Sequence, residues 1–133
     1  MADLIFKEES YKLIGACFEV HKALGHGFKE VVYQDALEVE LKQKSIPFSR
    51  EHPFTIYYKE QRLKHHFIAD FVVFDKIVIE LKATNYIGVP YIKQIMNYLK
   101  ASGLKLGIVV NFGTPSLEFQ RIIFKNLIIM HYD

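Results

Sequence analysis

The feature that most constrains this chain is a short apolar hairpin with three charged residues set into it. Its two arms, residues 67–74 and 77–82, are too apolar for surface strands, and such runs normally lie in the middle of a sheet. A buried carboxylate or ammonium costs several kcal/mol unless it is paired or binds a metal ion. The hairpin therefore predicts a strong local interaction among Asp70, Glu80 and Lys82.

The spacing of these three residues predicts that they meet. Side chains alternate along a strand, so Glu80 and Lys82 share one face, and a tight turn centred near Asp75 places Asp70 opposite Glu80. Two carboxylates beside one ammonium favour a hard divalent ion, Mg²⁺ or Mn²⁺, bound by oxygen ligands. The alternative is an internal salt bridge that only fixes the strand register, but it leaves one negative charge unbalanced.

The bulk composition narrows the class of protein. The 133 residues fit one domain, 1–133, with one core, and half of them are apolar. The single cysteine, Cys17, excludes an intramolecular disulfide and argues against a cysteine-based zinc site. The net charge of +2 is compatible with a nucleic-acid partner. No run approaches a membrane span and the first residues do not resemble a signal peptide, so we expect no membrane partner and a cytoplasmic location.

Hydrophobic periodicity predicts three helices and several strands. The expected helices cover residues 8–24, 29–44 and 90–102, and the expected strands cover 48–58, 63–74, 77–83 and 106–111, followed by one or two strands in the tail 117–132. The order is α-α-β-β-β-α-β with a β tail. This order predicts an α/β (α+β) sandwich in which a mixed central sheet is flanked by helices.

Further polar residues are placed near the acidic cluster by this arrangement. Gln94 and Tyr98 share one helix face, which could lie along the sheet toward the cluster or form a polar boundary. Glu30 opens the second helix, where the helix dipole favours an acid even without a function. Lys93 and Asn97 form a polar stripe that could contact a phosphate backbone or simply face solvent.

The charged hairpin resembles a known nuclease signature. Asp70, nine intervening residues and then Glu80-Leu81-Lys82 are similar to the D…ExK signature of the PD-(D/E)XK nuclease superfamily. A glutamate on a preceding helix and Gln-x-x-x-Tyr at residues 94–98 resemble its RecB-like branch.

Two further segments resemble a smaller family. Residues 27–34, Gly-Phe-Lys-Glu-Val-Val-Tyr-Gln, are similar to the motif of the GxxExxY family of small bacterial and archaeal proteins. The Asn111-Phe112-Gly113 segment at the end of a later strand also resembles that family. Together these resemblances imply a restriction-endonuclease-like core.

The resemblance also implies roles for individual residues. It implies that Asp70, Glu80 and the backbone carbonyl of Leu81 bind the metal ion, with Glu30 as a further ligand directly or through water. Lys82 would position or activate the attacking water and offset charge in the transition state. Gln94 and Tyr98 would orient the metal shell or the nucleic-acid backbone.

Three functions follow as expectations. The first is a divalent-metal-dependent nuclease that hydrolyses phosphodiester bonds in nucleic acid, with DNA as the expected substrate and a homodimer or a helicase or repair protein as a possible partner. The second is a non-catalytic nucleic-acid- or protein-binding module that retains the nuclease fold. The third is a structural protein whose charged cluster is an internal salt bridge.

Overall fold

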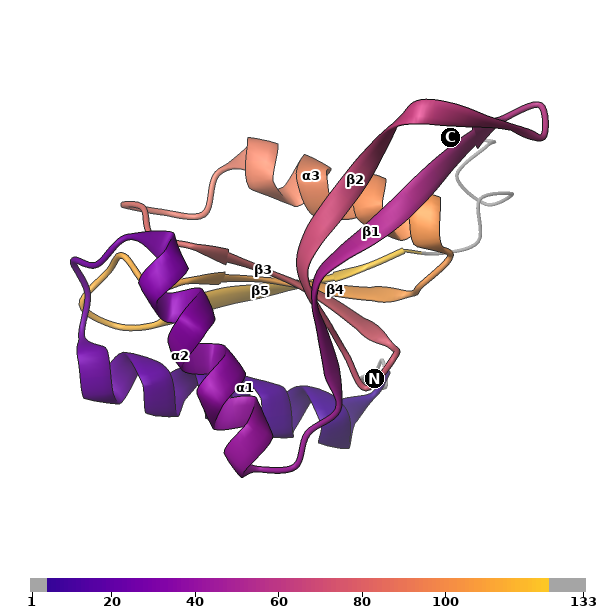
Figure 1. Cartoon of the computed structure of the whole chain (residues 1–133). Coiled ribbons are helices and arrows are strands. Elements are labelled where there is room, and N and C mark those ends of the chain that lie inside the picture. Colours follow the sequence, from indigo (N-terminus) through magenta and orange to yellow (C-terminus); the bar gives the residue numbers. More distant parts are fainter. Residues whose placement is uncertain (1–4, 125–133) are drawn as a thin grey trace.

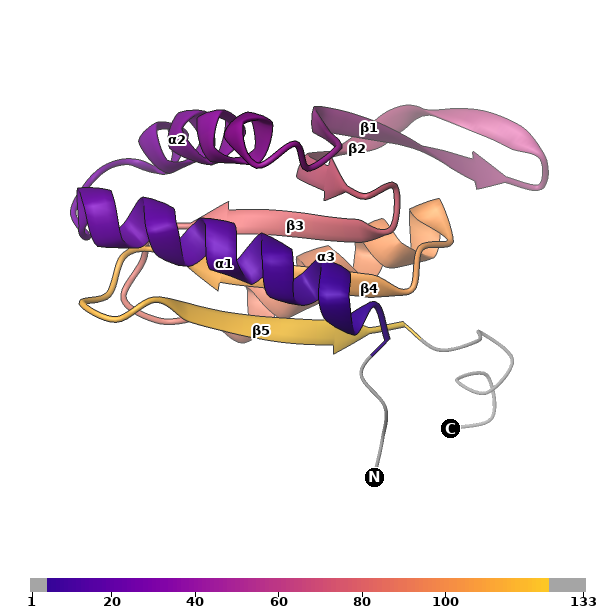
Figure 2. The same ribbon diagram turned by 90° about the horizontal axis from the view of Figure 1, so that it is seen from below.

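The computed structural model describes residues 5–124, which form a central sheet covered by helices on both faces (Figures 1 and 2). The elements in chain order are α1 (Lys7–Leu24), α2 (Glu30–Gln43), β1 (Phe48–Tyr58), β2 (Gln61–Val73), β3 (Ile77–Lys82), α3 (Val89–Ser102), β4 (Leu106–Asn111) and β5 (Glu118–Ile123). The predicted order of elements is confirmed. None of these described helices has the length and apolar character needed to cross a membrane.

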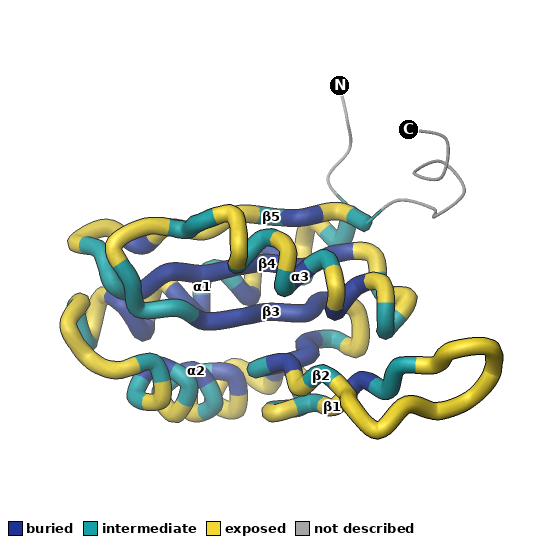
Figure 3. The backbone as a smooth tube through the Cα atoms, turned by 90° about the horizontal axis from the view of Figure 1, so that it is seen from above, coloured by how far each residue is buried: buried dark blue, intermediate teal, exposed yellow. Residues whose placement is uncertain are grey.

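The five strands form one mixed sheet in the order β1-β2-β3-β4-β5. β3 and β4 are parallel, and every other neighbouring pair is antiparallel. Parallel strands need a crossover connection, which α3 supplies. β3 and β4 occupy the centre of the sheet, where every residue except Lys82 is buried, as the dark tube in Figure 3 shows.

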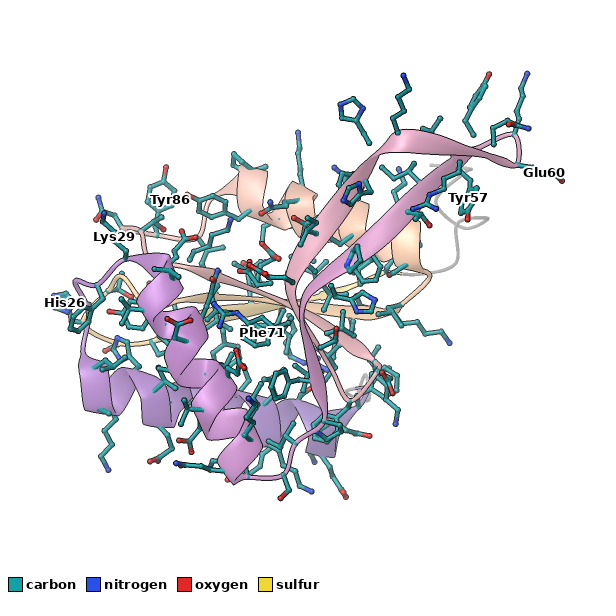
Figure 4. The ribbon with its side chains drawn as sticks, viewed as in Figure 1. His26, Lys29, Tyr57, Glu60, Phe71 and Tyr86 are labelled. Carbon is teal, nitrogen blue, oxygen red and sulfur yellow. The ribbon has the colours of Figure 1, made fainter. Side chains whose placement is uncertain are left out.

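Two apolar layers enclose the sheet. α1 and α2 cover one face, and their buried residues, such as Leu13 and Leu37, pack against the side of the sheet that presents Phe71. Figure 4 shows Phe71 in the middle of this layer. α3 covers the other face, where Ile95 packs with Val78. β3 therefore lies between two apolar layers, which is the environment that makes a charge on this strand costly.

One sequence prediction about the strands needs correction, and another is confirmed only as far as the described residues reach. The turn between β1 and β2 consists of Lys59 and Glu60, which have positive φ angles, so β2 begins two residues earlier than the expected start at residue 63. In the tail, β5 is one strand that ends at Ile123, and the part of the predicted tail from residue 125 onward lies outside the described residues.

Candidate active site

The site is built where β2 and β3 separate. The two strands pair from their turn as far as Phe71 and Ile79, so Asp70 and Glu80 would form the next pair. Here the two carboxylates, rather than backbone carbonyls, accept the hydrogen bonds between the strands. The Asp70 N–H donates to Glu80 Oε2 at 2.6 Å, and the Leu81 N–H donates to Asp70 Oδ2 at 2.8 Å. The predicted register is confirmed, and we call Asp70 and Glu80 the carboxylate pair.

Burial makes the carboxylate pair hard to ionise. Glu80 is only 3% exposed, and burial, reinforced by the charge of Asp70, raises its pKa to about 8. Burial also raises the pKa of Asp70, although the Leu81 N–H and the charge of Lys82 act in the opposite direction. A divalent cation would relieve both the desolvation and the mutual repulsion, and oxygen donors suit Mg²⁺ or Mn²⁺. The residues present therefore fit a metal ion of this class.

Lys82 lies beside the carboxylate pair without forming an ion pair with either acid. No nitrogen–oxygen distance of 4.0 Å or less joins Lys82 to Asp70 or Glu80. Its Nζ lies 4.6 Å from the centroid of the Tyr91 ring at the start of α3, and its charge lowers the pKa of both acids. The internal salt bridge that the sequence left open as an alternative is therefore not formed.

α2 directs two polar side chains toward this region. Glu30 is its first residue, and the negative charge of Glu30 raises the pKa of both members of the carboxylate pair. Gln34, one turn further, lowers the pKa of Asp70. Within residues 5–124, however, no three His, Cys, Asp or Glu side chains lie close enough together to hold a metal ion. The structure thus places Glu30 within electrostatic reach of the carboxylate pair but not in a three-residue cluster with it.

α3 contributes a hydrogen-bonded pair from the other side. Gln94 Nε2 donates to the Tyr98 hydroxyl at 3.0 Å, which agrees with their predicted common face. Burial raises the pKa of Tyr98 to about 12, and the charges of Glu80 and Asp70 add to the effect. Tyr98 therefore lies close enough to the carboxylate pair for the two negative charges to raise its pKa.

Two other predicted residues of α3 lie apart from these groups. Lys93 and Asn97 are exposed on the outer surface of the helix. The structure does not bring either of them into the carboxylate pair, and their exposure leaves them accessible to a large ligand.

A clamp that residue spacing did not indicate holds the chain just after Lys82. Asn111, fully buried at the end of β4, accepts a hydrogen bond from the Thr84 N–H at 2.9 Å and donates one to the Thr84 carbonyl at 3.0 Å. Gly113 packs directly against the backbone of Thr84. The sequence pointed to Asn111 and Gly113 only through the family resemblance; a fully buried asparagine at a strand end is the available signal.

Tyr33 holds the segment that precedes Glu30. Its ring is fully buried and stacks on Phe112 with centroids 4.7 Å apart. Its hydroxyl donates to the Gly25 carbonyl at 2.6 Å and accepts from the Phe28 N–H at 3.3 Å. The tyrosine of the GxxExxY-like segment is therefore a positioning residue for the start of α2.

Gly113→Ala is expected to lower the free energy of unfolding by about 1–3 kcal/mol, the usual range for overpacking. An added Cβ would overlap backbone atoms of Ala83 and Thr84, which cannot rotate away. Urea denaturation measures the change. Gly15→Ala in α1 is the matched control, because a Cβ there meets nothing within 4 Å and alanine favours a helix. Equal stability of Gly113→Ala and the unaltered protein would contradict the clamp.

The pattern of a carboxylate pair and a neighbouring lysine on two central strands agrees with the comparison of the whole sequence. The family model described as the PD-(D/E)XK nuclease superfamily matches residues 7–122. The chain belongs to this superfamily. No curated protein matches the sequence.

Solved structures show the same fold. A protein described as SSO0001 superposes with a TM-score of 0.58 at 19% identity, covering 95% of this chain and 65% of that one. This chain thus spans slightly less than two thirds of that protein. An alkaline exonuclease from Laribacter hongkongensis superposes with a TM-score of 0.54 at 14% identity, covering 98% of this chain and 76% of that one. At these identities the likeness shows the fold, and the predicted nuclease-type core is confirmed.

Proposed function

We propose that this chain is a divalent-metal-dependent nuclease that hydrolyses phosphodiester bonds in DNA. The observation that carries the proposal is the carboxylate pair where β2 and β3 separate, with Glu80 buried and Asp70 half-buried. The pair is hard to ionise and lies beside a lysine that forms no ion pair with it. Stability of the fold does not require these charges, because apolar residues at the same positions would cost less free energy to bury. Membership of a nuclease superfamily favours phosphodiester hydrolysis as the reaction that this arrangement of charges serves.

The metal site in this proposal uses oxygen atoms from both strands. Asp70, Glu80 and the backbone carbonyl of Leu81 would hold Mg²⁺ or Mn²⁺, and Glu30 would act through a water molecule because it lies outside the carboxylate pair. When bound, such an ion lowers the pKa of water and stabilises negative charge on the scissile phosphate.

The remaining residues act on the nucleic acid and on water. Lys82 positions the attacking water and offsets the charge that develops on the phosphate. Gln94 and Tyr98 form a hydrogen-bonded unit that orients the groups around the carboxylate pair. Lys93 and Asn97, exposed on α3, contact the nucleic-acid backbone.

The wider assignment is also part of the proposal. Within the superfamily we propose the RecB-like branch and the GxxExxY family, on the motifs at residues 27–34, 94–98 and 111–113. We further propose that residues 1–133 act as one nuclease domain in the cytoplasm. A second copy of the chain, or a helicase or repair protein, is the kind of partner we propose for it.

Cleavage of a panel of labelled nucleic acids tests the proposal. Single- and double-stranded DNA and RNA are incubated with the protein in Mg²⁺, in Mn²⁺ or in EDTA. We expect cleavage of DNA with either metal ion and none in EDTA. Cleavage that persists in EDTA, or no cleavage of any substrate, would overturn the proposal.

A second candidate function is a binding module that keeps the fold without turnover. It is favoured by one observation: among residues 5–124, no third acidic or histidine side chain joins the carboxylate pair. This candidate predicts binding of nucleic acid that is unaffected by EDTA, together with no cleavage in the panel above.

A further inference from the structure

The outer end of the β1–β2 hairpin, residues 57–66, extends away from the rest of the molecule; we call it the hairpin arm. Figures 1 and 3 show it projecting past the helices. Every residue of the arm is exposed, including Tyr57, Tyr58 and Leu63, at 62%, 60% and 41%. An exposed two-stranded ribbon is marginally stable by itself in water and is usually covered by other elements. An arm with both faces in solvent therefore needs an explanation outside the packing of the fold.

The hairpin arm carries the excess positive charge of the protein. It contains Lys59, Arg62 and Lys64 against the single carboxylate of Glu60, so its net charge of +2 equals that of the whole chain. None of the ion pairs formed within residues 5–124 involves these cations. The arm is therefore a local positive surface on a chain whose remaining charges cancel, and such a surface attracts phosphates.

Strand pairing sets which side chains of the arm share a face. His66 pairs with Thr55 and Arg62 pairs with Tyr57, and because Thr55 and Tyr57 are two residues apart on β1, Arg62 and His66 lie on one face of the ribbon. Lys64 lies at the register shift between these two pairs. Tyr57 is the cross-strand partner of Arg62 and lies on the same face. At the tip, Lys59 Nζ lies 5.4 Å from the centroid of the Tyr58 ring. Figure 4 shows Tyr57 and Glu60 at the end of the arm, far from Phe71 in the core.

We infer that the hairpin arm inserts into the major groove of duplex DNA and contacts its phosphates through Lys59, Arg62 and Lys64. This inference rests on the proposed nuclease function and names its substrate as double-stranded. The major groove of B-form DNA is about 12 Å wide and admits a two-stranded ribbon. A-form RNA has a deep, narrow major groove that excludes one.

The arm lies on the same strand as one member of the carboxylate pair. Arg62 precedes Asp70 by eight residues on β2, which spans at most about 26 Å at about 3.3 Å per residue. This separation is short enough for one duplex to contact both.

Binding measured in EDTA tests the inference separately from cleavage. The variant Lys59→Gln/Arg62→Gln/Lys64→Gln is compared with the unaltered protein for a labelled DNA duplex of two helical turns, by fluorescence anisotropy at several salt concentrations. We expect at least about tenfold weaker binding, and a slope of log affinity against log salt that is smaller by about 2.7, or about 0.9 for each phosphate contact. Arg62→Gln alone should give about one third of the slope change.

The matched control removes three exposed lysines of α1 instead. The variant Lys7→Gln/Lys12→Gln/Lys22→Gln changes the net charge equally, and we expect little change in binding or slope.

Several results would overturn the inference. Equal binding of the long duplex by the arm variant and the α1 variant would exclude a role for the arm. An equal loss of affinity for single-stranded DNA or for duplex RNA would exclude insertion into the major groove. If the arm variant loses duplex binding although the unaltered protein cleaves nothing, the inference stands and the proposed nuclease function fails.

Discussion

Glu80→Gln is expected to reduce metal-dependent cleavage by at least about a thousandfold, because it removes a charged ligand that the amide cannot replace. The same substitution should stabilise the metal-free protein at pH 8. An amide can still accept the hydrogen bond from the Asp70 N–H, and it removes a carboxylate that is 3% exposed beside a second one. Loss of activity together with a gain of stability distinguishes a functional charge from a structural one.

The stability effect should depend on pH in a defined direction. The pKa of Glu80 is about 8 in the folded protein against an ordinary value of 4.5, so the folded state binds its proton more tightly than the unfolded state does. Its contribution is therefore fully present below about pH 4.5 and is lost as the pH rises through 8. The raised pKa of Asp70 acts in the same direction. In EDTA, the unaltered protein should lose on the order of 3 kcal/mol over this window.

Urea denaturation in EDTA at pH values near both ends of this window measures the effect. Glu80→Gln should lose clearly less stability with rising pH than the unaltered protein. Glu19→Gln, an exposed position on α1, is the control and should change neither cleavage nor the pH dependence. Retention of cleavage by Glu80→Gln, or an unaltered loss of stability with pH, would count against the carboxylate pair as the metal site.

Lys82→Met is expected to reduce cleavage by about a hundredfold to a thousandfold, the usual effect of removing one group that stabilises developing charge. Its effect on the free energy of unfolding should stay within about 1 kcal/mol, because Lys82 makes no ion pair with the carboxylate pair and contacts the Tyr91 ring instead. Single-turnover cleavage at saturating Mg²⁺ and urea denaturation measure the two quantities separately.

The structural-protein hypothesis predicts the opposite result for Lys82. Breaking a buried ion pair typically costs about 3–5 kcal/mol, because the partner charge stays buried and unpaired. A loss of that size in Lys82→Met, without any loss of cleavage, would favour that hypothesis. Lys12→Met on α1 serves as the control for a change of one exposed charge, and it should affect neither quantity.

The carboxylate pair was predictable from the sequence because charged residues are rare in buried, apolar strands. Charged residues inside apolar strands stand out against their surroundings, and the turn length fixes the strand register, so the sequence alone places Asp70 opposite Glu80. The helix spacing of Gln94 and Tyr98 was equally local, and their hydrogen bond agrees with it. Both of these predictions depend only on residues that are close in sequence.

The remaining features depend on contacts that no local pattern contains. Asn111 reaches Thr84 across 27 residues of sequence, through the parallel pairing of β3 with β4. The hairpin arm has the composition of a strand, but alternation does not reveal whether another element covers it. Lys82 was expected to converge with the acids, and its approach to Tyr91 depends on where α3 packs.

Binding of Mn²⁺ to the metal-free protein at pH 8, measured by isothermal titration calorimetry, tests the central claim most directly. The account predicts saturable binding to the unaltered protein, weakened at least about tenfold in Asp70→Asn and in Glu80→Gln and unchanged in Glu19→Gln. Equal binding by the unaltered protein and both substituted proteins, or no binding by any of them, would contradict the assignment of the carboxylate pair as a metal site.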